Sequence, residues 1–500
     1  MRLSKEQLIQ KIKQTLKQVG TSQMSQSPYD LGWLLRLPAG RHGLPDPKNP
    51  KKPRYPQIIF WLEKLQHKDG SWGGAIPFAH DRVISTLSVI AGLSRWPLDK
   101  IWRGRIAKAI KAVEINSKKL LKEPEATVAF ELLFPKLLND CEKAGVKIKI
   151  PARVLNYYSK LKKEKLSKLP IEAATKQPTT LLHALEALDD NIDFRLFAKF
   201  QSPGGSFGCS PASTAFMLAK GLGGPKAERY LDALVKKRVV PPVQPIDLFE
   251  RAWCLFPIYL FGLENYFSRE LKPHIKYLQK YWTDNGVGWS IDLPVSDLDD
   301  TSLVFYVLQK NKKKPNIIVF KKFETDRGFV CYEGERSGSA SHYIHLFFAL
   351  STCQNGNSRI ARMRRKIINY LSRAQTNQGF WNDKWHISPY YATSRAILAL
   401  AGYPETEPMV NKATQWILKT QHKNGLWGFG KGTVEETAYA LAALHCINQD
   451  INGELKKAFI KGAMALRRNK RENSAQMWIE KSLFAPTNIN KFFIIGARLL

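Results

Sequence analysis

QHKDGSW, at residues 66–72, is the first of four copies of one motif: a glutamine, any three residues, a glycine, one further residue and an aromatic ring. The other copies are QSPGGSF (201–207), QTNQGFW (375–381) and QHKNGLW (421–427). The glycine permits the positive-φ turn that ends a helix, and the aromatic ring can pack back over that turn. The last two copies begin 46 residues apart, about the length of one helical hairpin in a repeat array. Four copies in one register therefore predict stacked helical hairpins.

Helical periodicity runs through the sequence around these copies. Apolar residues recur at helix spacing in segments such as IIFWLEKLQ (58–66) and EETAYALAALHCI (435–447), whereas alternating strand patterns are scarce. Near the N-terminus, Ser4 and Gln7 have the spacing of a capping box. Because the motif copies separate into an N-terminal and a C-terminal group, we expect an all-α fold of two α/α-barrel domains.

Length and composition exclude several classes of protein. With 500 residues, of which 44% are hydrophobic, the chain can bury the cores of two or three domains and is not disordered. No apolar run reaches the roughly 20 residues needed to cross a bilayer, and the N-terminus lacks the apolar stretch of a secretory signal. Six cysteines without a CxxC pair indicate reduced thiols and predict a cytoplasmic protein.

The charge is strongly basic, because 77 Lys and Arg against 43 Asp and Glu give a net charge of +34. A basic surface is typical of nucleic-acid binding, but these cations are dispersed, as in LKKEKLSK (161–168), and no zinc finger, RNP motif or basic zipper accompanies them. We interpret the cations mainly as solvated faces and expect no nucleic-acid partner. The charge also indicates that the substrate or a surface met by this protein is anionic.

SDLDDTSLVFYVL (296–308) places three acids, Asp297, Asp299 and Asp300, at the start of an apolar helix. Such acids commonly cap a helix and favour the positive end of its dipole, which is one explanation for them. Three carboxyls this close cannot all ionise cheaply in a poorly solvated site, so one pKa should rise and one proton should stay bound. A neutral carboxylic acid beside an apolar cavity could protonate a base as weak as an alkene.

The longer run YWTDNGVGWSIDLPVSDLDDT (281–301), which contains these acids as a DxDD motif, resembles the class II diterpene cyclases, the copalyl-diphosphate-synthase-like branch of the terpene cyclases. The resemblance covers nearly the whole chain. Further stretches that are similar to the family are SPYDLGW (27–33), PTTLLHALE (178–186), SPASTAF (210–216), PIDLFERAW (245–253), CYEGERSGSASHYIHLFFAL (331–350) and DKWHISPYYATS (383–394).

Reactions of this family begin when the middle aspartate of DxDD protonates the terminal alkene of geranylgeranyl diphosphate. The resemblance therefore implies Asp299 as the acid, with Asp297 and Asp300 as the partners that hold its proton. His345 stands where plant relatives carry an acid-orienting asparagine, and an imidazole there could hydrogen-bond Asp299. A satisfied core histidine is the alternative interpretation of His345.

The resemblance also implies that the diphosphate is bound and retained. Lys165 and Lys384 occupy positions where the family uses lysines against phosphate oxygens, and Arg82 is a further candidate. A solvated lysine remains the alternative for Lys165, which lies in a lysine-rich stretch. The acidic cluster that recruits Mg²⁺ in the family resembles KEPEATVAFELLFP (122–135), and a solvated helix face is its alternative. That stretch offers Glu123, Glu125 and Glu131 as candidate metal ligands.

The family resemblance leaves the product open. Aromatic faces can stabilise the migrating positive charge, and the candidate wall residues are Trp289, Trp385, Tyr390 and Tyr391. In plant relatives a His–Asn pair positions the water that removes the last proton; the histidine matches His183, but the asparagine position falls on Pro242. Copalyl diphosphate of either hand and a rearranged halimadienyl or clerodienyl diphosphate therefore remain alternatives.

Domain organisation follows from the same resemblance, in which one barrel is inserted within the other. Residues 50–255 are expected to form the insert, and residues 1–49 with 256–500 the barrel that carries DxDD. We expect a stand-alone prokaryotic cyclase whose product needs a separate class I diterpene synthase. The run DDNID (189–193) matches the DDxxD of class I enzymes but is interpreted as a charged loop. The rival functions are a squalene–hopene-type triterpene cyclase and a non-catalytic helical-toroid binding protein.

Overall fold

The computed structural model describes residues 4–40, 43–169, 171–189, 191–333, 335, 338–354, 357–447, 453–469 and 474–500. The chain divides into two compact units: unit 1 consists of Met1–Gln23, Ile246–Ala475 and Ala485–Leu500, and unit 2 of Met24–Pro245 and Gln476–Phe484. Unit 2 is thus inserted into unit 1 in chain order. These divisions differ from the expected boundaries at 49/50 and 255/256, because the helix at Pro28–Leu34 packs within unit 2 and the helix at Asp247–Leu260 packs within unit 1.

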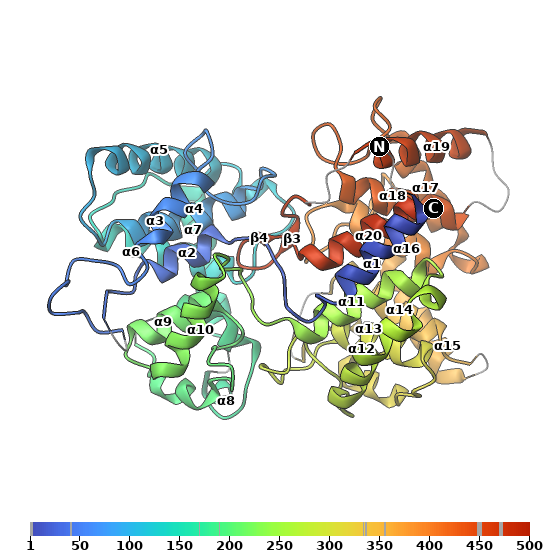
Figure 1. Cartoon of the computed structure of the whole chain (residues 1–500), viewed down its shortest axis with the longest axis horizontal. Coiled ribbons are helices and arrows are strands. Elements are labelled where there is room, and N and C mark those ends of the chain that lie inside the picture. The colour runs from blue at the N-terminus through green and yellow to red at the C-terminus, as the bar shows by residue number, and fades with distance from the viewer. Residues whose placement is uncertain are drawn as a thin grey trace. The chain divides into compact units, whose positions relative to one another are not determined.

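Unit 1 is built of paired helices, which Figure 1 labels, and its inner helices close a ring through their packing. Its elements are α1 (Lys5–Leu16), α11 (Asp247–Leu260), η4 (Glu264–Tyr266), α12 (Ser268–Tyr281), α13 (Leu298–Lys310), η5 (Ile317–Phe323), β1 (Glu324–Thr325), β2 (Gly328–Phe329), α14 (Ala340–Ser351), α15 (Ser358–Ala374), α16 (Pro389–Leu400), η6 (Pro404–Thr406), α17 (Glu407–Lys419), α18 (Val434–Ile447), α19 (Gly453–Arg468) and α20 (Thr487–Leu499). The inner helices α11, α13, α14, α16, α18 and α20 each pack against the next, and α20 returns to α11. The inner helices are buried on nearly every side, whereas the outer helices α12, α15, α17 and α19 bury one apolar stripe.

Unit 2 closes a smaller ring in the same way. Its elements are α2 (Pro28–Leu34), α3 (Gln57–Leu65), α4 (Ala79–Leu93), α5 (Lys100–Ser117), η1 (Leu120–Lys122), α6 (Phe130–Lys143), α7 (Ala152–Leu166), α8 (Ile171–Ala174), η2 (Thr180–Ala187), η3 (Phe194–Phe200), α9 (Pro211–Ala219), α10 (Gly224–Lys236), β3 (Trp478–Ile479) and β4 (Leu483–Phe484). The inner ring runs through α2, α4, α6, η2 and α9, and α9 packs back on α2. The predicted helical fold is therefore confirmed, and the strands among the described residues are two short antiparallel pairs.

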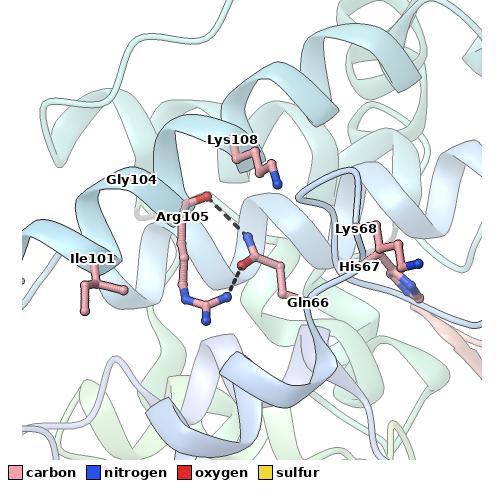
Figure 2. A pocket seen from close by; sticks show the side chains of 7 residues that line it. All are labelled: Gln66, His67, Lys68, Ile101, Gly104, Arg105 and Lys108. Carbon is pink, nitrogen blue, oxygen red and sulfur yellow. Dashed lines mark hydrogen bonds between the residues drawn. The ribbon is translucent and has the colours of Figure 1, made fainter.

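The repeated motif closes each hairpin as its sequence predicts. The four motif glycines have φ between +89° and +106°, and a Cβ added to any of them would lie within 2.8 Å of a lysine carbonyl group on the following outer helix. Figure 2 shows the glutamine of the first copy, where the Gln66 amide donates to the Arg105 carbonyl oxygen at 3.2 Å and Arg105 donates back to the Gln66 side-chain oxygen at 2.9 Å. The Trp72 indole donates to the carbonyl oxygen of Leu62, in the helix before the turn, at 2.8 Å. Each motif thus joins two helices by defined hydrogen bonds.

The structure also contains the capping box and the free thiols that the sequence predicts. Ser4 and Gln7 form the predicted capping box of α1, which packs on α20 near the other end of the chain (Figure 1). All six cysteines are free thiols. Every helix among the described residues is too short or too polar to span a bilayer.

Candidate active site

The acids of the DxDD motif occupy the first turn of α13, on the inner ring of unit 1. Asp297 is the N-cap, and its Oδ1 accepts the backbone N–H of Asp300 at 2.7 Å. The N–H of Leu298 donates to the carbonyl oxygen of Cys331 at 2.9 Å, which ties the loop after β2 to the start of this helix. Asp297 and Asp300 are 1% and 4% exposed, whereas the side chain of Asp299 is 14% exposed. Asp299 is therefore the most accessible of the three.

His345, on α14, lies against Asp299. Its Nδ1 is 2.5 Å from Oδ1 of Asp299, and its ring is fully buried, edge-on to Trp253 with 5.4 Å between ring centroids. Phe256 closes another side at 6.2 Å. The other ring nitrogen, Nε2, has no hydrogen-bond partner among the described residues. His345 is thus held by packing with one nitrogen aimed at the middle aspartate.

Burial changes the protonation of the two flanking acids. It raises the pKa of Asp297 to about 7, from an ordinary value of 3.8. Burial also raises the pKa of Asp300 well above its ordinary value, and the charge of Asp297 adds to that shift. One carboxyl oxygen on each of these two residues has no partner among the described residues. Burial thus favours a retained proton on the cluster, in agreement with the sequence-based expectation.

Lys384 lies in unit 1 with a carboxylate partner that the sequence interpretation did not single out. Its ammonium pairs with Oε1 of Glu335, whose other oxygen accepts the N–H of Cys331 at 3.0 Å. Asp383 is buried and accepts backbone N–H groups of Ser341 at the start of α14 and of Trp385. The DKWH stretch is thus fixed to the same loop that covers the start of α13.

The four aromatic candidates occupy different surroundings within unit 1. Tyr391 is buried, stacks on His386 at 4.5 Å and lies beneath the Arg395 guanidinium at 3.9 Å. Burial, and then the charges of Asp299 and Asp383, raise its pKa. Tyr390 instead packs on Trp416 of the outer helix α17 at 4.6 Å. Half-buried Trp289 lies edge-on to Tyr332 at 6.5 Å, and half-buried Trp385 faces the Lys384 ammonium at 5.0 Å.

In unit 2, His183 makes a short contact with a residue from the distant segment 476–484. Its Nε2 lies 2.5 Å from Oε1 of Glu480, and its Nδ1 lies 2.6 Å from the carbonyl oxygen of Gly208. The adjacent Lys481 is fully buried, with its ammonium 2.7 Å from Glu186 and 2.7 Å from the carbonyl oxygen of His183. Although burial acts to lower the pKa of Lys481, the charges of Glu186 and Glu480 raise it. A buried ion pair therefore fixes the segment that supplies Glu480.

The remaining cationic candidates of unit 2 also have partners. Lys165 is half exposed and pairs with Glu131 at 3.2 Å. Arg82, in α4, is buried and donates to the hydroxyl of Ser71 at 2.9 Å; burial lowers its pKa.

The three glutamates considered for Mg²⁺ form no common cluster. Glu123 caps α4 by accepting the N–H groups of Ala79 and His80, and it also bonds the His80 ring at 2.7 Å. Glu131 pairs with Lys165, and Glu125 is half-buried. Within the described ranges, no group of three or more His, Cys, Asp or Glu side chains is arranged to hold a metal ion. These residues do not fit a preformed three-carboxylate centre.

The DDxxD-like run has ordinary surface partners. Asp189 pairs with Lys162 at 2.6 Å, and Asp193 caps η3 while bonding Arg195. Asp190 lies outside the described residues. The interpretation of this run as a charged loop agrees with these contacts.

The chain is similar to known proteins in its sequence and in its fold. The family model described as squalene-hopene cyclase C-terminal domain matches residues 344–498. Copalyl diphosphate synthase 1 of Selaginella moellendorffii is 33% identical over 389 residues, which are 76% of this chain and 51% of that protein. The chain spans about half the length of the curated relatives it matches.

Two solved structures resemble the fold over most of the chain. The ent-copalyl diphosphate synthase from Streptomyces platensis has a TM-score of 0.81 at 26% identity and covers 98% of this chain and 99% of that one. The ent-copalyl diphosphate synthase from Arabidopsis thaliana, in complex with (S)-15-aza-14,15-dihydrogeranylgeranyl thiolodiphosphate, has a TM-score of 0.69 at 26% identity. It covers 92% of this chain and 73% of its own.

Proposed function

Since the chain belongs to the class II diterpene cyclases, we propose that it converts geranylgeranyl diphosphate into a copalyl-type (labdadienyl) diphosphate. Protonation of the terminal alkene starts the cascade, two rings close, and the diphosphate stays on the product. The observation that carries this proposal is the hydrogen bond between Asp299 and His345 at the acidic start of α13.

Asp299 is the proposed acid because it is the accessible member of a cluster that retains a proton. If His345 donates its Nδ1–H to Oδ1, the acidic hydrogen resides on Oδ2. In the first step that O–H bond breaks, and the π electrons of the alkene form the new C–H bond. The carboxylate left on Asp299 keeps the N–H of His345 as a charge-assisted donor, which stabilises the developing negative charge.

Asp297 and Asp300 are proposed to keep the cluster protonated. Both are buried and have raised pKa values, so full ionisation of the three acids is costly at neutral pH. The carbocation formed after protonation then needs aromatic faces, and buried Tyr391 is the candidate whose pKa responds to the charge of Asp299. Trp289, Trp385 and Tyr390 are kept as proposed wall residues from the family resemblance.

Diphosphate binding is proposed for the ammonium groups of Lys384 and Lys165, with Arg82 as a further donor. Each lysine already pairs with a glutamate, Glu335 or Glu131, so a diphosphate would replace that carboxylate as the partner. We propose Mg²⁺ as the counterion of the bound diphosphate. A Mg²⁺ ion that binds substrate phosphates commonly takes only one or two carboxylates from the protein. Chelation is then expected to raise KM for the substrate rather than to unfold the protein.

Termination is proposed to use the pair of His183 and Glu480. A carbonyl oxygen only accepts hydrogen bonds, so Nδ1 of His183 carries a hydrogen directed at Gly208. The contact between Nε2 and Glu480 also needs one proton, because two lone pairs would repel at this distance, and we propose that this proton resides on Nε2 and leaves Glu480 as a carboxylate. Neither nitrogen is then left to accept a proton from the substrate. The Glu480 carboxylate is therefore the proposed acceptor: a C–H bond beside the cation breaks, its electrons form the new alkene, and the proton goes to Glu480.

The setting of the reaction follows from the thiols and the product. Six free thiols support a reducing compartment such as the cytosol. A product that still carries its diphosphate remains a substrate for ionisation, so we propose that a separate class I diterpene synthase consumes it.

The function is tested by incubation with geranylgeranyl diphosphate, followed by dephosphorylation and mass spectrometry of the alcohol. We expect a bicyclic labdadienyl alcohol from the wild-type protein, and none from Asp299→Asn with an unchanged melting temperature. Turnover of squalene in preference to the diphosphate would assign the chain to triterpene chemistry. Near-wild-type turnover by Asp299→Asn would remove Asp299 as the acid.

A further inference from the structure

Helix α5, on the outside of unit 2, presents an unusual face to solvent. Its inward face buries Ile106, Ala109, Ala112, Val113, Asn116 and Ser117. The outward face carries both exposed isoleucines and exposed lysines at helical spacing. We call these residues, together with the two lysines that directly follow the helix, the α5 stripe, and it consists of Ile101, Lys108, Lys111, Ile115, Lys118 and Lys119. Ile101 and Ile115 are 67% and 56% exposed, so both aliphatic side chains point away from the core of their own unit.

The charge along this helix has one sign. From residue 100 to residue 122 the sequence has eight Lys and Arg and a single acid, Glu114. Glu114 is half-buried, and its carboxylate accepts the backbone N–H of Lys149 at 3.0 Å. That hydrogen bond brings the loop with exposed Lys147 and Lys149 beside the C-terminal half of α5, which adds two cations to the same surface.

The other end of the stripe is hollowed (Figure 2). Ile101, Arg105 and Lys108 of α5 line a depression together with Lys68 from the turn after α3. The nearby carboxylate of Glu63 pairs with Arg105 at 2.7 Å. Exposed Ile101 and two lysines, Lys68 and Lys108, therefore line the same depression.

Aliphatic side chains set among lysines match the chemistry of an anionic lipid surface. Lysines meet the negative headgroups, while the aliphatic chains enter the boundary of the acyl region. A single-stranded nucleic acid would instead favour exposed aromatic rings among the cations, whereas the aromatic ring of α5, Trp102, is half-buried with the Arg105 guanidinium 5.5 Å from its centroid. We propose that unit 2 docks through the α5 stripe on the surface of an anionic bilayer, without crossing it. This interface accounts for part of the +34 charge that cyclisation leaves unexplained.

Vesicle co-sedimentation of the full chain tests the proposal. Wild-type protein should pellet with vesicles of equal phosphatidylglycerol and phosphatidylcholine, and should stay in the supernatant with phosphatidylcholine alone. The variant Lys108→Glu/Lys111→Glu/Lys118→Glu should lose at least about 100-fold in partition coefficient, the scale for three lysines near an anionic surface. The matched control reverses the same number of charges on α15, whose exposed cations have no exposed large apolar neighbour on that helix. That control, Arg362→Glu/Arg365→Glu/Arg373→Glu, should stay within about threefold of wild type.

A second variant separates lipid from nucleic acid as the occupant. Ile101→Ser/Ile115→Ser keeps the charge and should weaken vesicle binding by about tenfold, while any retention of single-stranded DNA stays unchanged. Equal losses in the two charge-reversal variants would overturn the α5 stripe as a specific surface. Vesicle binding unaffected by the isoleucine change would overturn a lipid interface and leave a general cation surface. Unchanged melting temperatures show that the exposed substitutions leave the fold intact.

Discussion

Replacing His345 with phenylalanine removes the hydrogen bond to Asp299 and leaves the acid itself in place. The imidazole is fully buried between Trp253 and Phe256, so a ring of similar size keeps much of the packing. A hydrogen bond to a charged group contributes about 1.5–3 kcal/mol. If the bond forms mainly to the carboxylate that develops in the transition state, kcat should fall by about 10- to 150-fold. Because His345 contacts the acid rather than the substrate in this account, KM should change little.

The assay is single-turnover conversion of geranylgeranyl diphosphate, with the bicyclic product quantified by mass spectrometry after dephosphorylation. His345→Asn serves as the matched variant, because it restores a donor and is the residue that plant relatives carry there; it should recover part of the lost rate. Melting temperatures of the three proteins control for loss of packing. A His345→Phe rate within about threefold of wild type, at an unchanged melting temperature, would refute the positioning role and leave His345 as a core residue.

Three further changes test other parts of the account. Burial raises the pKa of Asp297 from 3.8 to about 7, so the contribution of this carboxyl group to stability is present below about pH 4 and is lost as pH rises through 7. The melting temperature of the wild-type protein should therefore fall between pH 5 and pH 8, and Asp297→Asn should reduce that fall. An equal fall in both proteins would contradict the raised pKa. Gly425→Ala forces a side chain to φ +89° with its Cβ 2.8 Å from the carbonyl oxygen of Lys461, and should cost about 1–3 kcal/mol in urea unfolding. Gly402→Ala, at φ +91° with open space around the Cβ, should cost less, and equal costs would remove the close approach as the reason. Glu480→Gln should shift the product from the labdadienyl alkene towards hydroxylated or rearranged diphosphates, whereas an unchanged product profile would demote Glu480 to packing.

The fold was predictable because its decisive features are local. Each motif glycine ends a helix by its own positive-φ backbone conformation. Each motif indole donates a hydrogen bond to the carbonyl oxygen of the residue ten positions earlier, as Trp381 does to Leu371. The similarity over 98% of the chain to a solved structure agrees with the resemblance found in the DxDD stretch.

The divisions between units were harder to predict. Segment 476–484 joins unit 2 through contacts with residues such as Asp81, some 400 positions away, and no sequence period marks it.

The candidate site was predictable where chemistry is concentrated in one stretch. Three acids in four residues indicated a retained proton, and the raised pKa values of Asp297 and Asp300 agree with that prediction. Glu480 and Glu335 were missed, because each lies in a segment without a motif that marks it as a site residue, and each meets its partner only after folding. The only sequence signal for Glu335 was its place inside a family-like stretch. Partners of this kind become visible only with the structure.

Cyclisation in heavy water tests the central claim most directly, because carboxyl protons exchange with solvent before the reaction. In D₂O, geranylgeranyl diphosphate should give a bicyclic diphosphate that carries one deuterium in the ring methylene beside the carbon with two methyl groups, with no inorganic pyrophosphate released. A product without deuterium, or release of pyrophosphate in step with turnover, would contradict proton transfer from Asp299 to the alkene.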